Sequence, residues 1–367
     1  DKEYTLKNGV TTFLKDFENV MCVMTNAALP NVFICTNLMD VTAAGVESIT
    51  DMYSSPSNKD VDPNPIMAFF YYAFFGLMLS DAGYGLLMLI FAIFAKNKLK
   101  VTGNLKKTAD MVLYCGISTV FWGAMFGGFF GDLIPTICEK FLGMPELPSF
   151  AIWMEPMNNS IELLLYCFLF GIVHLMAGVL IRGYMLIRDK NYLGAICDTV
   201  PVLVFVAGFA VVGANFFTDI PDNVVSVGAK VLAVGAALIV FTAGRSSKNI
   251  LGKLGGGLYG LYNAASGYLG DILSYSRLLA LGLVTGVIAN VINLLGAMTG
   301  NIITFVLIFL IGHTVNIAIN LMGTYVHTSR LQYVEFFSKF YEGAGRTFTP
   351  FKIKSKFFTI KEENKYE

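Results

Sequence analysis

Long apolar runs, separated by short polar segments, fill the chain from residue 66 onward. They cover residues 66–79, 84–95, 109–130, 161–187, 193–217, 224–243, 258–296 and 302–340. A helix needs about 20 predominantly apolar residues to cross the hydrocarbon core of a bilayer. The pattern therefore predicts an all-α polytopic membrane protein whose transmembrane domain extends over residues 63–351.

The runs at the two ends of this series depart from that length. The first two are short and meet at residues 80–83, which predicts a tight hairpin that Asp81 caps or turns. The last two are nearly twice as long as one span requires, so each is either two spans or one tilted helix. Neither contains a proline or a turn signal, which favours tilted helices. We therefore expect eight transmembrane helices, the last two long and strongly tilted.

The segment before the first run has a different character. Residues 1–62 are polar and mixed, and they lead into a proline-rich link at residues 62–65. We interpret them as a small N-terminal remnant of a cytoplasmic domain with its linker, and residues 352–367 as a cytoplasmic C-terminal tail. The chain begins with Asp1 and shows no initiator Met and no signal peptide, so we expect further sequence upstream.

Basic residues sort by alternate connections between the predicted helices. If the first helix starts in the cytoplasm, the cytoplasmic connections and tail carry Lys96, Lys98, Lys100, Lys106, Lys107, Arg182, Arg188, Lys190, Arg245, Lys248, Lys253, Lys339, Arg346, Lys352, Lys354, Lys356, Lys361 and Lys365. The opposite side carries Lys140 and Lys230 beside several acidic residues. This is the positive-inside bias of a cell-membrane protein with both termini in the cytoplasm. A large soluble helical core would not sort its charges in this way.

Composition agrees with a membrane protein and excludes several other classes. The chain is 55% hydrophobic and 14% charged, whereas soluble domains carry about 25% charged residues. Its net charge of zero argues against a nucleic-acid partner. The six cysteines form no C-x-x-C pair, so they read as buried apolar residues and not as metal ligands. There is no G-x-x-x-x-G-K-[ST] phosphate loop and no nucleophile–base pattern, so we expect no catalytic site and no cofactor.

Two arginines fall within the last two runs, where a permanent charge is costly. Arg277 lies near the middle of residues 258–296, and Arg330 lies within residues 302–340. Inserting an arginine at the bilayer centre costs about 3 kcal/mol, and the side chain stays protonated. A long arginine side chain can avoid this cost by extending to the membrane–water interface. This explanation is weak for Arg277, whereas for Arg330 it is a serious alternative to a functional role. Arg277 needs water or a partner outside its own helix, since Asp271 is off its face.

The last run also carries a stripe of polar residues spaced three or four apart. Its members are His313, Asn316, Asn320, Thr324, His327 and Arg330, and the stripe continues toward Glu335 and Lys339. This spacing predicts that they share one helical face. Isolated polar residues in membrane helices usually hold helices together. A whole face with an arginine instead favours a water-lined ion path.

The preceding run offers a looser set of polar residues for the same path. It comprises Asn263, Asp271, Ser274, Thr285, Asn290 and Asn293. For Asp271 two roles stay open: it neutralises an arginine on a neighbouring helix, or it faces the cytoplasmic interface. His174 lies alone in an apolar run and reads as a packing histidine with satisfied hydrogen bonds, not as a ligand.

Three stretches of the chain resemble one family, subunit a (subunit I) of V-type and A-type rotary ATPases. They are FFYYAFFGLMLSDAGYG at residues 69–85, SYSRLLALGL at residues 274–283, and RLQYVEFFSKFYEGAG at residues 330–345 followed by FTPF at residues 348–351. They stand in the family's order and spacing across residues 60–351. The resemblance implies the membrane half of the subunit, with Arg277 and Arg330 at the two essential arginines of the family. Asn320 and Thr285 stand where many eukaryotic relatives have Glu and His, which favours an aqueous path over a carboxylate relay.

The resemblance also implies partners and a mechanism. A rotating proteolipid ring with a membrane carboxylate on each subunit would pass the two tilted helices. Two half-channels on this chain would load and unload H⁺ or Na⁺, and the arginines would attract the ionised carboxylate and block a direct leak. Peripheral-stalk subunits and a central-stalk cap subunit would be further partners, and ATP chemistry would belong to other chains.

One alternative function is a secondary ion-coupled transporter, which would also carry charges within the membrane. Such transporters usually show internal repeats and broken helices near the bilayer midplane. We see no repeat, and the charges concentrate toward the C-terminus. A purely structural anchor would not need Arg277. The sequence does not distinguish H⁺ from Na⁺.

Overall fold

The structure is a computed structural model, and it describes residues 38–54, 61–98, 104–140, 143, 151–215, 217, 221–244 and 250–343. These residues form helices without an extended strand. Six helical stretches are long and apolar enough to cross a membrane: Leu105–Phe126, Ser160–Arg188, Tyr192–Ala214, Asp222–Ala243, Gly252–Met298 and Ile302–Phe340. The predicted all-α polytopic class is confirmed, whereas the number of spans and their tilt stay predictions.

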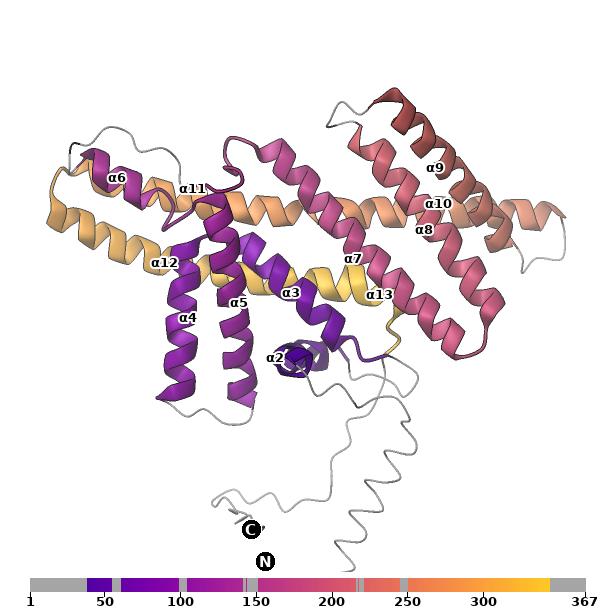
Figure 1. The fold of residues 1–367 in the computed structure, drawn as a ribbon, viewed down its shortest axis with the longest axis horizontal. Coiled ribbons are helices and arrows are strands. Elements are labelled where there is room, and N and C mark those ends of the chain that lie inside the picture. The colour runs from indigo at the N-terminus through magenta and orange to yellow at the C-terminus, as the bar shows by residue number, and fades with distance from the viewer. Residues whose placement is uncertain are drawn as a thin grey trace, which may run out of the picture.

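The described residues form thirteen helical segments, and Figure 1 labels the α-helices among them. They are α2 (Leu38–Tyr53), α3 (Asn64–Leu79), α4 (Ala82–Asn97), α5 (Asn104–Phe126), α6 (Leu133–Lys140), α7 (Ser160–Arg188), α8 (Tyr192–Ala214), α9 (Asp222–Ala243), α10 (Ile250–Ser274), α11 (Ser276–Met298), α12 (Ile302–Arg330), a π-helix (Leu331–Phe337) and α13 (Ser338–Phe340).

The turn between α3 and α4 forms as predicted, but the two helices do not pair. Ser80 adopts a left-handed conformation with φ of 42°, and the Asp81 carboxylate caps α4 by accepting from the amides of Gly83 and Tyr84. The two helices diverge from this turn (Figure 1), and each packs along α5. Gly123 lets α5 approach the turn closely, because a Cβ there would lie 2.1 Å from the Ala82 nitrogen. The predicted cap is confirmed, and the predicted tight hairpin is wrong.

The two long runs near the C-terminus form long helices, each with one irregularity. Residues 250–298 continue in nearly one direction as α10 and α11, with a single-residue break at Tyr275 (Figure 1). Helix α12 ends in the π-helix Leu331–Phe337. Helices α11 and α12 lie across the direction of α4 and α5 in this view. The break at Tyr275 and the π-helix both fall next to the charged residues of the candidate site.

Helix α2 packs into the same core as the apolar helices. Its buried residues Val46 and Ile49 join a cluster that includes Tyr71 of α3 and Phe336 and Phe337 of the π-helix. The Lys107 ammonium on α5 pairs with the Glu47 carboxylate on α2. This helix, although it lies within the segment assigned to the cytoplasmic remnant, therefore fixes the ends of α3, α5 and α12 relative to one another.

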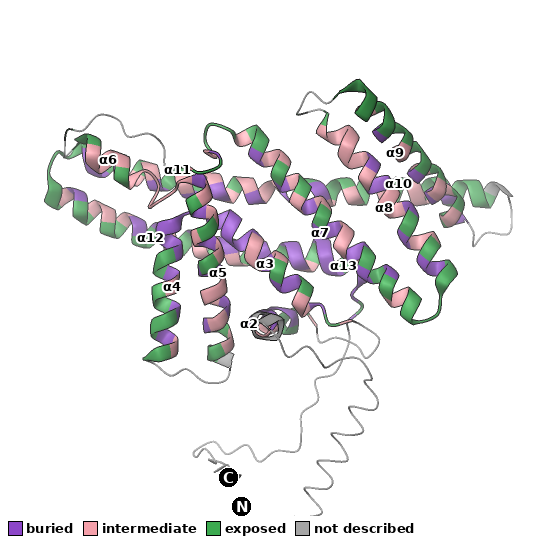
Figure 2. Cartoon of the chain, viewed as in Figure 1, coloured by how far each residue is buried: buried purple, intermediate pink, exposed green. Residues whose placement is uncertain are grey.

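Many large apolar side chains are exposed, and Figure 2 shows exposed positions along most of the long helices. Helices α8 and α9 pack closely on each other at Gly208 and Gly235, and both keep exposed apolar faces. Such surfaces are unfavourable in water and favourable in lipid.

Some helix ends lie at two opposite ends of the molecule. The C-terminal end of α4 and the turn between α7 and α8 lie at the lower end in Figure 1, and α6 lies at the upper end. Lys98 follows α4, Lys190 lies between α7 and α8, and Lys140 ends α6. This arrangement agrees with the charge pattern, and which end is cytoplasmic stays a prediction. Other residues used for that pattern lie outside the described residues: Lys100, Arg245, Lys248, Arg346, Lys352, Lys354, Lys356, Lys361 and Lys365.

Candidate functional site

The polar stripe of α12 faces the interior of the protein. His313, Asn316, Asn320 and Thr324 are all buried, at 4% exposure or less. The opposite face of α12 is apolar and exposed, through Ile311, Val315, Ile319, Met322 and Val326.

Arg330 lies on the exposed face of α12 and not in the stripe. The last two spacings of the stripe, from Thr324 to His327 and from His327 to Arg330, are three residues each, which is less than the 3.6 residues of a helical turn. Arg330 therefore lies about 100° around the helix axis from His313. The prediction that Arg330 continues the stripe is therefore wrong. No carboxylate of the described residues forms an ion pair with it.

The first half of the stripe belongs to a continuous hydrogen-bonded chain that joins three helices. The Asn320 amide donates to the Asn316 side-chain oxygen at 2.5 Å, and the Asn316 amide donates to the Tyr84 hydroxyl of α4 at 2.7 Å. That hydroxyl lies 2.7 Å from His313 Nδ1. His313 Nε2 lies 3.0 Å from the side-chain oxygen of Asn293 on α11.

An acidic residue sets the direction of this chain at its far end. The Asn293 amide donates to the Asp132 carboxylate at 2.9 Å and to the Phe130 carbonyl at 2.8 Å, and both partners only accept. The Asn293 oxygen must therefore face His313, whose Nε2 carries the proton. In the neutral imidazole, Nδ1 then accepts from Tyr84. Every donor in the chain points toward Asp132.

Asp81 holds the loop that supplies these acceptors. Besides capping α4, its carboxylate accepts from the Phe130 amide at 3.0 Å and the Gly131 amide at 2.7 Å. Phe130 and Gly131 both have positive φ, at 50° and 67°. The Asp81 carboxylate thus stabilises a turn that presents the Phe130 carbonyl and Asp132 to Asn293.

The second half of the stripe is not saturated by hydrogen bonds. Thr324 Oγ1 and His327 Nδ1 of the stripe, and Gln332 Nε2 of the following π-helix, are buried atoms with no partner among the described residues. Buried polar groups normally find a partner in protein or ordered water. These three atoms are therefore buried polar groups that the described part of the protein leaves without a partner.

Arg277 lies at the start of α11, beside the break at Tyr275, and has an acidic neighbour. Its Nη1 lies 3.6 Å from Oε1 of Glu335 in the π-helix. The Glu335 side chain is 2% exposed, and that of Arg277 is 30% exposed. Glu335, assigned to the path lining, is therefore a carboxylate of this chain that lies beside Arg277, whereas the sequence predicted a carboxylate of the ring as its partner.

Two further polar groups flank this pair. The Asp271 carboxylate of α10 pairs with the Lys339 ammonium of α13. Asp271 thus neutralises a cation of a neighbouring helix, which is a lysine and not an arginine. The Ser274 hydroxyl donates to the Gly270 carbonyl at 3.1 Å within α10.

His174 of α7 is a buried packing residue, as predicted. Its Nδ1 lies 2.8 Å from the Tyr275 hydroxyl, and its Nε2 lies 3.1 Å from the Gln332 side-chain oxygen. Its ring stacks on Phe336, with centroids 4.4 Å apart. His174 therefore ties α7 to the break after α10 and to the π-helix that carries Glu335.

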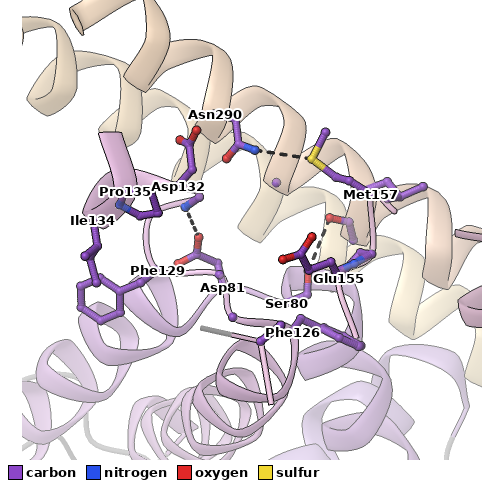
Figure 3. A pocket seen from close by; sticks show the side chains of 18 residues that line it. Ser80, Asp81, Phe126, Phe129, Asp132, Ile134, Pro135, Glu155, Met157 and Asn290 are labelled. Carbon is purple, nitrogen blue, oxygen red and sulfur yellow. Dashed lines mark hydrogen bonds between the residues drawn. The ribbon is translucent and has the colours of Figure 1, made fainter. Parts of the chain in front are cut away.

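A cavity of about 250 Å³ lies between α11 and the turn that follows α5 (Figure 3). Asp81, Asp132 and Glu155 line it, together with Gly282, Gly286 and Asn290 of α11. The Asn290 amide contacts the Met157 sulfur at 3.4 Å, and its side-chain oxygen has no partner among the described residues. The cavity thus brings carboxylates to the glycine face of α11.

The remaining predicted residues make few contacts within the candidate site. The Thr285 hydroxyl is buried and donates to the Leu281 carbonyl at 2.9 Å within α11. Asn263 is exposed on α10. Sequence reasoning missed Tyr84, Asp132, Tyr275 and Gln332. A tyrosine inside an apolar run was the available signal for Tyr84.

Comparison with known proteins identifies the family to which this chain is similar. Residues 271–353 match the model of the V-type ATPase 116 kDa subunit family. The chain is 31% identical over 342 residues to the A-type ATP synthase subunit I of Methanocaldococcus jannaschii, covering 85% of this chain and 48% of that protein. It is 33% identical over 318 residues to the same subunit of Pyrococcus horikoshii, covering 84% and 46%. The V-type ATP synthase subunit I of Borreliella burgdorferi is 28% identical, covering 82% and 51%.

The chain spans about half the length of the curated relatives that it matches. The family-model match begins just before Arg277 and includes Arg330 and Glu335. The relatives align over most of this chain. The chain therefore belongs to the family of subunit I of the A-type and V-type ATP synthases.

Proposed function

We propose that this chain is the stator of the membrane sector of a V/A-type rotary ATPase, where it forms two half-channels for H⁺ or Na⁺ against a rotating proteolipid ring. The observation that carries the proposal is the position of Arg277. This permanent charge lies among apolar helices and keeps part of its side chain at an uncovered surface.

Two exposed apolar rows form the surface proposed to meet the ring. On α11, the row comprises Val284, Ile288, Val291 and Leu295, and Arg277 lies at its start. On α12, the row of Ile311, Val315, Ile319, Met322 and Val326 ends at Arg330. Apolar ring helices would cover both rows, and each row places an arginine at its end nearer the π-helix. A membrane carboxylate passing along the rows would meet both charges.

The unsaturated half of the stripe supports an aqueous path to the cytoplasmic side. Thr324, His327 and Gln332 leave polar atoms without protein partners and lead along α12 toward Arg277 and Glu335. Water in this path would solvate an ion on its way to the ring carboxylate. The saturated half, His313 to Asn320, instead holds α4, α11 and α12 together.

The cavity beside α11 supports a second path that opens on the opposite side. Its carboxylates would raise the local concentration of cations. Gly282 and Gly286, which follow Arg277 on α11, line this cavity. The two paths reach α11 and α12 from opposite ends, and the positive charge of Arg277 would stand between them.

The proposed cycle needs little from this chain beyond positioned charges. Arg277 attracts an ionised ring carboxylate, so the carboxylate releases its cation into one path and takes a new one from the other. The guanidinium stays charged throughout and repels cations, which prevents a leak between the paths. ATP hydrolysis or synthesis would take place on other subunits, with the ring and the stalk subunits as partners.

Cysteine cross-linking to the ring tests the proposal. In the complete complex, we expect a cysteine at Val284 or Ile288 to form disulfides with cysteines introduced into ring helices. A cysteine at Ala289, on the buried face of the same helix, serves as the control. Equal cross-linking at Ile288 and Ala289, or none at either exposed position, would contradict the proposed surface.

A further inference from the structure

Arg277 and Glu335 form a loose ion pair. Their closest atoms are 3.6 Å apart, which is too long for a hydrogen bond. Arg277 Nη1 and Glu335 Oε2 are both buried without a hydrogen-bond partner among the described residues. Arginine and carboxylate groups that bind each other firmly make two parallel hydrogen bonds. Arg277 and Glu335 do not form these two hydrogen bonds.

The carboxylate is the fixed member of the pair. Glu335 is buried in the π-helix and is followed by two buried residues: Phe336 stacks on His174, and Phe337 stacks on Tyr341. The Arg277 side chain is partly exposed, and its guanidinium presents five donors on a long flexible stem. The guanidinium can therefore contact Glu335 with one nitrogen and present the others to the uncovered surface.

We propose that Glu335 is the resident counter-ion of Arg277, which it positions and partly neutralises whenever no ring carboxylate is bound. This inference rests on the proposed function, because it assigns the second carboxylate to the ring. A charge without any partner would be costly among apolar helices. A fully hydrogen-bonded internal pair would hold Arg277 away from the ring. In the loose pair, Arg277 is neither without a counter-ion nor held away from the ring.

Glu335 is thus a positioning residue that acts through Arg277. Its negative charge competes with the ring carboxylate for the guanidinium. An incoming H⁺ or Na⁺ can then displace Arg277 from the ring carboxylate at a lower concentration than it otherwise could. Without this competing charge, Arg277 holds the ring carboxylate more tightly, and more of the ion is required to load it.

The test compares Glu335→Gln and Glu335→Asp in the complete reconstituted complex. ATP-driven transport is measured over pH at fixed sodium and over sodium at fixed pH. With Glu335→Gln, we expect the ion concentration for half-maximal transport to rise about tenfold or more, as for the loss of one close charge. Maximal transport at saturating ion should fall much less, and Glu335→Asp should restore most of the wild-type profile.

Glu47→Gln is the matched control, since Glu47 pairs with Lys107 on α5, away from α11. It should leave the ion dependence unchanged. A Glu335→Gln complex that loses maximal transport without a shift in ion dependence would overturn the inference, because a structural role predicts that result. An unchanged profile would overturn it as well.

The proposed function fails in a different way. If Arg277 does not face the ring, then Arg277→Ala leaves transport near normal. If the stator role is right and the counter-ion role is wrong, Arg277→Ala abolishes transport while Glu335→Gln keeps the wild-type ion dependence. The two variants therefore separate the two failures.

Discussion

The Tyr84 hydroxyl lies 2.7 Å from Nδ1 of His313, although the two residues are 229 positions apart in the sequence. The contact joins α4 to the middle of the buried face of α12. The same hydroxyl accepts from the Asn316 amide at 2.7 Å. One side chain of α4 therefore completes the hydrogen bonding of two residues of the stripe.

Replacing Tyr84 by Phe should destabilise the protein by several kcal/mol. The change leaves His313 Nδ1 and the Asn316 amide buried without a partner, and each such group costs about 1–3 kcal/mol. Thermal unfolding of the purified protein in detergent measures the effect. Tyr262→Phe is the control, because Tyr262 is 68% exposed on α10. Equal unfolding temperatures for the two variants would contradict the role given to Tyr84.

Asp81→Asn should destabilise the turn after α5. Asparagine retains one acceptor oxygen, but its amide group would face the backbone amide of Gly131 or of Phe130. The expected cost is about 1–3 kcal/mol. Asp110→Asn provides a matched control, since Asp110 pairs with the partly exposed Lys96 at 2.5 Å, and such surface pairs contribute about 0–1 kcal/mol. If Asp110→Asn proves the more destabilising change, the anchoring role of Asp81 is refuted.

Accessibility to water should differ between the two halves of the stripe. In a background without native cysteines, a cysteine at Thr324 or His327 should react with a small water-soluble thiol reagent added from the cytoplasmic side. A cysteine at Asn316 should react slowly, because the saturated network leaves no partner-free atom there for water. Similar rates at Asn316 and Thr324 would rule out the division proposed here.

The membrane orientation can be tested at described residues of the connections. Cysteines at Lys98 and Lys190 should be labelled by an impermeant reagent from the cytoplasmic side, and a cysteine at Lys140 from the opposite side. The prediction follows from the alternation of basic connections and from their positions at two ends of the fold. Labelling of Lys140 and Lys98 from the same side would require a different topology.

Local sequence patterns predicted much of the fold and part of the candidate site. Hydropathy reports on burial in lipid, so the apolar helices and the cap at Asp81 were predictable from neighbouring residues. The stripe from His313 to Thr324 was predictable because it follows the helical repeat. Arg330 was misplaced because small angular differences add up along a helix.

Partners from distant segments were not predictable in this way. Neither Tyr84 nor Asp132 has a sequence relation to His313, and their contacts depend on how α4, α5 and α12 pack. The pairing of Arg277 with Glu335 depends on the break at Tyr275 and on the π-helix, and the sequence marks neither. Hydrogen bonding then distinguishes a saturated half of the stripe from an unsaturated one, although both halves consist of polar residues.

Transport by the complete complex with Arg277→Ala tests the central claim most directly. We expect that the variant complex assembles with its ring and loses ATP-driven transport, since the principal charge that attracts the ring carboxylate is removed. Arg277→Lys should also fail, because lysine lacks the fixed planar fork and can lose its proton when desolvated. Arg330→Lys should be milder, since Arg330 is exposed. Near-normal transport by an assembled Arg277→Ala complex would contradict the account.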